Sequence, residues 1–213
     1  MSNNDKLAAP ELAAIDIQGM TRQSFMVKGA IAAGTVYGVS TVAPFISEAI
    51  AQEGGGDVDI LNFALTLEYL ENAFYQQALK NVSGLSGDVK EIATTLQENE
   101  AEHVDALTEA IKGLGGTPVK APGVDFGNAF SNQKAFLKTA QTFEDLGVSA
   151  YNGAAPMIKS KEVLGSAGSI VQVEARHAAA IRELNGQPIT ASAFDKPADE
   201  QQVLAAVKPY VKS

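Results

Sequence analysis

Four stretches of the chain repeat apolar residues at intervals of three and four, the spacing that gives a helix one apolar face. They run over about residues 57–80, 88–114, 131–155 and 160–184. A shorter stretch over 198–207 predicts a fifth helix. The pattern therefore predicts an all-α protein.

The connections between these stretches predict a four-helix bundle. Residues 81–87 form a tight link between the first and second helices, and Pro156 separates the third from the fourth. Residues 113–127 are rich in Gly and Pro and too long for a simple turn, which indicates a crossover between helices two and three. We expect the bundle to occupy residues 57–185, with a tail over 186–213 that holds the short helix.

Helix ends carry their own signals. Asp57 or Asp59 is expected to cap the first helix, and Asn185 with Gly186 is expected to end the fourth. Residues 54–56 are three glycines, which indicate a hinge before the bundle.

The chain before the hinge differs in character. Residues 1–20 form a polar lead-in, and residues 21–51 resemble a signal or anchor segment with an Ala49-Ile50-Ala51 cleavage pattern. The apolar run over 29–50 has a second interpretation, a retained helix that packs on the bundle or anchors the chain to a membrane.

Charged residues interrupt the apolar faces of the second and fourth helices. The chain has two histidines, and each closes a Glu-x-x-His tetrad that places a carboxylate and an imidazole on one helix face. Each tetrad lies within an apolar stripe. The second helix contributes Leu96, Glu100, His103, Leu107 and Ile111, and the fourth contributes Ile170, Glu174, His177, Ala178 and Ile181.

The first and third helices each add one acid to an apolar stripe. These acids are Glu68 and Glu144, and a tyrosine follows each of them seven residues later, at Tyr75 and Tyr151. The two halves of the bundle therefore read as a repeat, each with a lone Glu followed by a Glu-x-x-His. Two such hairpins packed about a pseudo-twofold axis would bring four carboxylates and two imidazoles together.

This ligand set predicts a centre for two divalent metal ions. Four buried carboxylates would repel one another, and two divalent cations would balance their charge. Oxygen and imidazole donors without sulfur favour iron or manganese over zinc. The predicted ligands are Glu68, Glu100, His103, Glu144, Glu174 and His177.

Neighbouring residues leave alternatives open. The tetrads could be surface residues spaced by three, and Glu71 competes with Glu68 because it lies one turn further on nearly the same face. Its repeat counterpart is Gly147, which favours Glu68. We expect the hydroxyls of Tyr75 and Tyr151 to hydrogen-bond near the site, with a redox role as the alternative. Glu98 and Glu102 are expected to be solvated.

Composition narrows the partners. The net charge is −9, and the 16 Lys and Arg residues are scattered, which argues against nucleic acid. The chain has no Cys, which excludes disulfides, iron–sulfur clusters and thiolate zinc sites.

Residues 62–75, together with these ligand positions, resemble the ferritin-like superfamily and its secreted ferritin-like-domain group, which includes desiccation-associated relatives. The segment over 21–28 is similar to a twin-arginine export signal, with Gln23 in place of the second arginine. The resemblance implies a di-iron or di-manganese centre that handles oxygen, peroxide or ferrous iron, as a ferroxidase or a catalase or peroxidase, in stress protection.

Rival functions come from other classes. The chain could be a non-enzymatic accessory subunit anchored to a membrane or a larger complex, or a metal-storage protein without turnover. We expect export to the periplasm or cell envelope, or membrane anchoring through residues 29–50 if the leader is retained. The exposed faces of the bundle make a homodimer plausible.

Overall fold

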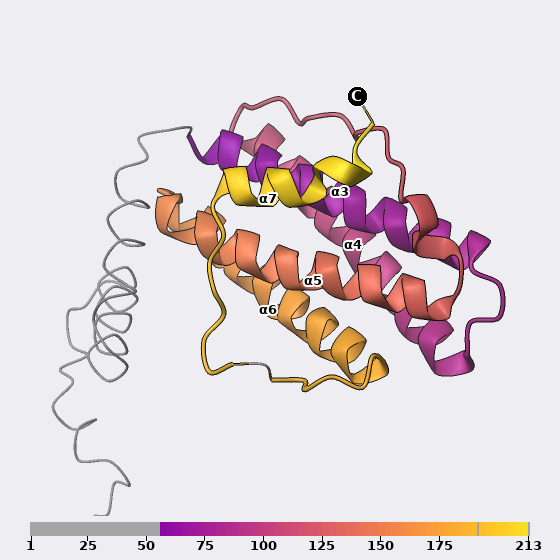
Figure 1. Ribbon diagram of the computed structural model, residues 1–213. Coiled ribbons are helices and arrows are strands. Elements are labelled where there is room, and N and C mark those ends of the chain that lie inside the picture. The colour runs from indigo at the N-terminus through magenta and orange to yellow at the C-terminus, as the bar shows by residue number, and fades with distance from the viewer. Residues whose placement is uncertain (1–55, 191, 213) are drawn as a thin grey trace, which may run out of the picture. The chain divides into compact units, whose positions relative to one another are not determined.

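Four long helices form the centre of the protein (Figure 1). The computed structural model describes residues 56–190 and 192–212, so the expected lead-in over 1–20 and the signal or anchor segment over 21–51 lie outside the described residues. The helices are α3 (Asp57–Asn81), α4 (Gly87–Gly113), α5 (Gln133–Ala154) and α6 (Lys161–Leu184). Within the described ranges the only β pairing is an isolated bridge, so the expected all-α bundle is confirmed there.

The helices pack as two hairpins. α3 lies mainly against α4, α5 mainly against α6, and contacts between α3 and α5 and between α4 and α6 join the two pairs. The apolar stripes predicted for α4 and α6 are buried throughout, and so are the predicted acid and tyrosine of α3 and of α5. Burial of these faces is what stabilises long amphipathic helices in water.

An aromatic cluster fills the core at one side of the polar centre. Phe74 of α3 is fully buried, and its ring centroid lies 5.0 to 5.5 Å from those of Phe126, Phe136 and Phe143. Such edge-on and offset ring contacts add stability beyond simple burial. The cluster joins α3, the crossover and α5, and so holds the two hairpins in register beside the centre.

The crossover between α4 and α5 is fixed at both ends. The Asn62 side chain of α3 donates to Thr117 O and accepts from Val119 N, at 3.2 and 2.8 Å. Further along, Val124 forms an antiparallel bridge with Val211, and Lys212 N donates to Gly123 O at 2.8 Å. The C-terminal segment thus pins the crossover to the bundle.

A short helix, α7 (Glu200–Val207), packs on α5 (Figure 1). Asp199 and Gln202 form a capping box at its start, in which each side chain bonds the backbone N–H of the other residue. Val203 and Val207 are its buried residues. The expected fifth helix is present and begins two residues later than predicted.

Helix caps differ in part from the predictions. Neither Asp57 nor Asp59 caps α3; its N-cap is Gly56, which has no side chain to bond the helix. Asp57 instead accepts from the backbone N–H groups of Lys159 and Ser160, at 2.8 and 2.7 Å, just before α6. The Asp57 carboxylate, predicted to cap its own helix, therefore bonds a neighbouring segment instead. The end of α6 is as expected, with its cap at Asn185 and Gly186 at a φ of 66°.

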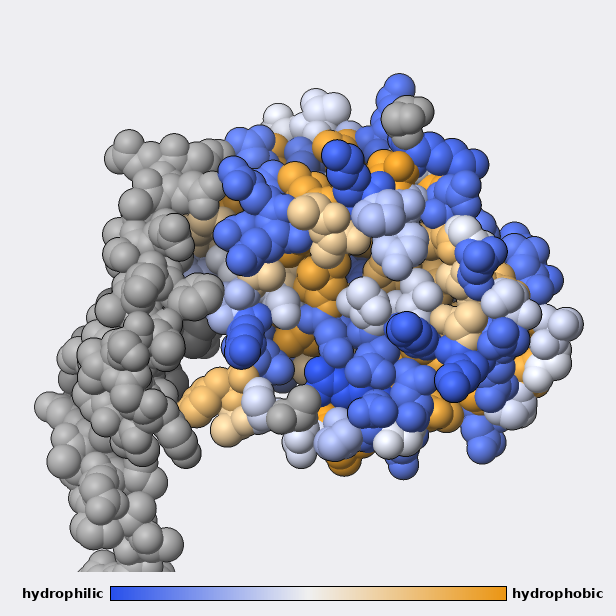
Figure 2. Space-filling model, viewed as in Figure 1, coloured by the Kyte–Doolittle hydropathy of each residue, from blue (hydrophilic) through white to orange (hydrophobic). Residues whose placement is uncertain are grey.

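The surface is mostly polar. Figure 2 shows hydrophilic residues spread over the visible face of the bundle, with smaller apolar patches between them. Among the described helices, none has the length and hydropathy needed to cross a membrane.

Candidate metal centre

The middle of the bundle holds seven buried ionisable side chains. None is more than 9% exposed, and all point inward from the apolar faces of the four helices. They are Glu68, Glu71, Glu100, His103, Glu144, Glu174 and His177. Burying so many charged groups costs several kcal/mol each unless they are paired or bound to a cation.

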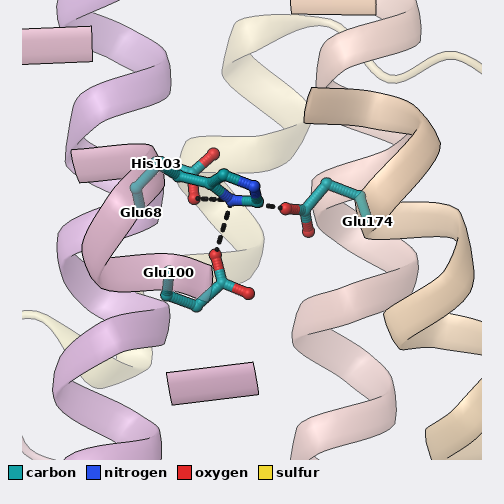
Figure 3. Close-up of side chains that lie close together, drawn as sticks. All are labelled: Glu68, Glu100, His103 and Glu174. Carbon is teal, nitrogen blue, oxygen red and sulfur yellow. Dashed lines mark hydrogen bonds and ion pairs between the residues drawn. The ribbon is translucent and has the colours of Figure 1, made fainter. Parts of the chain in front are cut away.

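In one group of four, three carboxylates surround the His103 ring, as Figure 3 shows. His103 Nδ1 lies 3.2 Å from Glu68 Oε2, 3.1 Å from Glu100 Oε2 and 3.1 Å from Glu174 Oε1. These side chains come from α3, α4 and α6. Their ligand atoms lie within 4.8 Å of one another, and we call this group the first position.

A second group of four lies beside it. His177 Nδ1 is 2.9 Å from Glu100 Oε1 and 3.5 Å from Glu144 Oε2. With Glu174 these residues again place ligand atoms within 4.8 Å of one another, and we call them the second position. Glu100 and Glu174 belong to both positions, so each could hold two metal ions.

Several side-chain atoms at this centre have no hydrogen-bond partner within the described part of the chain and are free to bind a cation. Five buried atoms here have no well-aligned hydrogen bond, although several lie close together. They are Glu100 Oε1, Glu144 Oε2, both carboxylate oxygens of Glu174, and His177 Nδ1. Native proteins rarely leave buried polar atoms unsatisfied, so lone pairs aimed at a common point indicate a ligand.

Two tyrosines hold the lone acids by crossed hydrogen bonds. Tyr75 of α3 donates to Glu144 Oε1 of α5, and Tyr151 of α5 donates to Glu68 Oε1 of α3, the latter at 2.5 Å. The crossing shows that α3 and α5 run antiparallel here. Each bond occupies one carboxylate oxygen and leaves the other facing the centre, as a hydrogen bond that orients a metal ligand would.

Asn99 contacts the far side of His177. Its amide nitrogen Nδ2 lies 3.0 Å from His177 Nε2, opposite the Nδ1 that faces the carboxylates. With Nδ1 as a metal ligand, Nε2 would carry the hydrogen, and the Asn99 amide, turned over, would accept it through Oδ1. The sequence did not predict this role for Asn99, because a half-buried polar residue beside an apolar stripe has no spacing that marks it as a site residue.

Comparison with protein-family models assigns the part of the chain that holds this centre to a family. The family model described as a ferritin-like domain matches residues 56–187, which include all four long helices and every residue of the centre. The chain belongs to the ferritin-like domain family. The predicted membership of the ferritin-like superfamily is therefore confirmed. A search among curated proteins found no match.

Protonation compensates charge within this ferritin-like domain. Burial would lower the pKa of His103, but contacts with Glu100, Glu174 and Glu68 raise it to about 12. Burial likewise opposes charging of His177, yet Glu100 and Glu144 raise its pKa to about 10. Burial would raise the pKa of Glu100, but hydrogen bonds with the two histidines lower it to about 2. Both imidazoles therefore act as cations that stabilise the Glu100 carboxylate.

The other acids of the ferritin-like domain are shifted the opposite way. Burial raises the pKa of Glu144 to about 8, against the attraction of His177. Burial and repulsion from Glu174 raise the pKa of Glu68 and Glu71 well above the usual range, and burial with repulsion from Glu100 raises that of Glu174. Without metal, protons on the histidines and on several of the acids therefore offset the negative charge that metal ions would otherwise balance.

The structure brings together all six residues predicted as ligands, from the four predicted helices. Glu98 and Glu102 are exposed, as expected. Glu71, the weighed alternative to Glu68, is also buried but belongs to neither group of four.

Proposed function

We propose that this ferritin-like domain binds two divalent ions, iron or manganese, and carries out redox chemistry on oxygen, peroxide or ferrous iron. The observation that carries the proposal is the pair of buried four-residue positions that share Glu100 and Glu174. The two shared carboxylates would hold both ions, and such a pair would supply redox chemistry on a small molecule.

The donor set supports the choice of metals. Six carboxylate and imidazole side chains without sulfur suit iron and manganese. Such ions, when bound, supply or accept the electrons of the reaction. Each histidine would act as a terminal ligand through Nδ1, the ring nitrogen that faces the carboxylates.

The chain's own residues would orient the ligands and exclude water. Tyr75 and Tyr151 fix the lone acids, and Asn99 fixes the ring of His177. His103 is the most exposed member of the centre, at 9%, so we place the route for small molecules on its side of the bundle. We assign the tyrosines to hydrogen bonding, since both hydroxyls already donate to carboxylates.

A second candidate function is a non-enzymatic accessory subunit. The four shared and lone carboxylates, Glu68, Glu100, Glu144 and Glu174, are wholly buried, a degree of enclosure that also suits an ion with a purely structural role. We further propose that the chain belongs to the secreted ferritin-like group. Residues 21–51 would direct its export to the periplasm or cell envelope, or residues 29–50 would anchor it to a membrane. In either case two copies of the bundle would assemble as a homodimer.

The test combines metal content with activity. We expect the purified full chain to hold two iron or manganese ions, and Glu100→Ala to lose ferrous oxidation and peroxide consumption with its helical content intact. Glu102→Ala, two residues away and exposed, is the matched control and should behave as wild type. Metal binding without either activity would favour the accessory role, and absence of binding would reject the centre.

A further inference from the structure

The internal repeat of the centre is broken at one pair of positions. Residues 68, 71 and 75 of α3 align with residues 144, 147 and 151 of α5. Two of these pairs match, Glu with Glu and Tyr with Tyr. The third places Glu71 opposite Gly147.

Gly147 leaves room for two carboxylates. A Cβ built at this glycine would stand 3.3 Å from Glu71 Oε1 and 3.0 Å from Glu174 Oε2, so a side chain here would force both acids to shift. Glu71 of α3 and Glu174 of α6 therefore meet over the bare backbone of α5. The missing side chain leaves this space to the two acids.

The position of Glu174 shows which part of the centre Glu71 faces. Glu174 Oε1 lies 3.1 Å from His103 Nδ1 in the first position. Its other oxygen, Oε2, lies beside Gly147 of α5, the helix that contributes Glu144 to the second position. Glu71 thus stands beside α5, which supplies Glu144 to the second position and no residue to the first.

Glu71 has no partner of its own within the part of the chain that the structure describes. The side chain is 3% exposed, yet its carboxylate forms no hydrogen bond or ion pair with any described residue, whereas Glu68 and Glu144 each accept from a tyrosine. Burying an acid is costly unless it is paired or bound to a cation. Oε2 of Glu174, beside Glu71 at Gly147, has no hydrogen-bond partner among the described residues, and a cation could bind both acids.

We propose that Glu71 is a seventh ligand, specific to the second position, and that it makes the two metal positions unequal. The inference rests on the proposed two-metal centre. The second position would have four carboxylates and one imidazole, against three carboxylates and one imidazole at the first. The additional negative charge favours an ion of higher charge, so Glu71 stabilises the oxidised state of the metal that it binds.

The experiment uses the full chain freed of metal by chelation and titrated with Mn²⁺, followed by calorimetry and electron paramagnetic resonance. The wild type should bind two ions in two unequal steps. Glu71→Gln, which keeps the shape of the side chain, should weaken one step at least about tenfold and leave the other nearly unchanged. Glu71→Ala should give the same result, and Glu102→Gln, an exposed acid, should have no effect.

The midpoint potential of the iron-loaded protein gives a second readout. Glu71→Gln should raise it, because the oxidised ion loses a negative ligand. If the wild type binds two ions and Glu71→Gln binds both as tightly, or weakens both steps equally, the seventh ligand is rejected and the two-metal centre stands. If the wild type binds no pair of ions, the centre itself is rejected, and the seventh ligand with it.

Discussion

At the scale of single residues, the crossed tyrosine bonds are the contacts that fix the lone acids. Seven residues, about two turns or roughly 10.5 Å, separate each tyrosine from the acid of its own helix. The hydroxyl therefore reaches the acid of the antiparallel neighbour, so that Tyr75 bonds Glu144 and Tyr151 bonds Glu68.

Removing one of these hydroxyls should weaken both the fold and the site. Tyr75→Phe leaves a buried carboxylate oxygen of Glu144 without its donor, so we expect a loss of about 1–3 kcal/mol in the free energy of unfolding. Metal affinity should fall about 10- to 100-fold, because the ligand loses its orientation. Denaturant unfolding and metal titration measure the two effects.

Tyr69→Phe is the control for this change, since Tyr69 is only partly buried and packs by its ring. Equal stability and equal metal affinity for the two phenylalanine variants would show that the Tyr75 hydroxyl contributes nothing.

The ligand residues could be predicted because each breaks an apolar stripe at a fixed spacing. Glu100 and His103 share a face by helix geometry alone, and the same holds for Glu174 and His177. The contacts of Asn99 and Glu71 could not be predicted, since they depend on which neighbouring helix lies opposite, at distances that sequence spacing does not encode.

At the scale of helices, the segment before α7 approaches α5 closely. Ala198 N donates to Ser149 O at 2.9 Å, and a Cβ at Gly153 would overlap the carbonyl oxygen of Ala198. The glycine is therefore required by the close passage of one backbone over another.

Gly153→Ala should release or strain this segment. We expect a loss of about 1–3 kcal/mol in the free energy of unfolding, as for other overpacked sites, and faster protease cleavage between residues 186 and 198. Gly165→Ala in α6 is the matched control: nothing stands within 4 Å of its added methyl group, so it should stabilise the helix by about 0.5–1 kcal/mol. Similar stability changes in the two variants would contradict the close contact.

The cap of α3 shows where sequence reasoning on helices fails. Helix ranges follow from apolar periodicity and agree with the structure to within two residues, but a cap prediction assumes that an acid bonds its own helix. Asp57 has a stronger option in two N–H groups before α6, at Lys159 and Ser160.

Asp57→Ala should therefore destabilise the connection between α5 and α6, where residues 159 and 160 lie. The expected loss is about 1–2 kcal/mol in the free energy of unfolding, with faster amide hydrogen exchange at residues 159–160. Asp59→Ala changes a neighbouring exposed acid and should have little effect. Exchange at 159–160 that does not differ between the two variants would exclude the bond.

At the scale of the whole molecule, charge at the centre links stability to pH. Glu144 has a pKa raised from 4.5 to about 8 and His177 one raised from 6.5 to about 10. A group whose pKa rises on folding contributes stability that is present below its unfolded value and is lost as pH rises through its folded value. Both contributions decline together between about pH 6.5 and 8.

The metal-free protein should therefore melt at a lower temperature at about pH 9 than at about pH 6, by roughly 2–4 °C for each kcal/mol lost. Added Mn²⁺ should reverse the trend, because its ligands bind in their deprotonated forms. Glu144→Gln should flatten the dependence without metal. A melting temperature that rises with pH in chelator would contradict the shifts.

The bundle class could be read from the sequence because four periodic stretches and one long connection leave few arrangements. The docking of the C-terminal segment on the crossover could not. Lys212 N bonds Gly123 O and Val211 pairs with Val124 through the backbone, which every residue type offers alike.

The sharing of Glu100 and Glu174 has a consequence for how the protein matures. Each hairpin alone holds two acids and one imidazole of the six, and the fourth donor at either position comes from the opposite hairpin. If two ions bind as proposed, metal uptake would require that the two hairpins have already packed together. A chain arrested before docking would stay empty, and a filled one would resist being pulled apart.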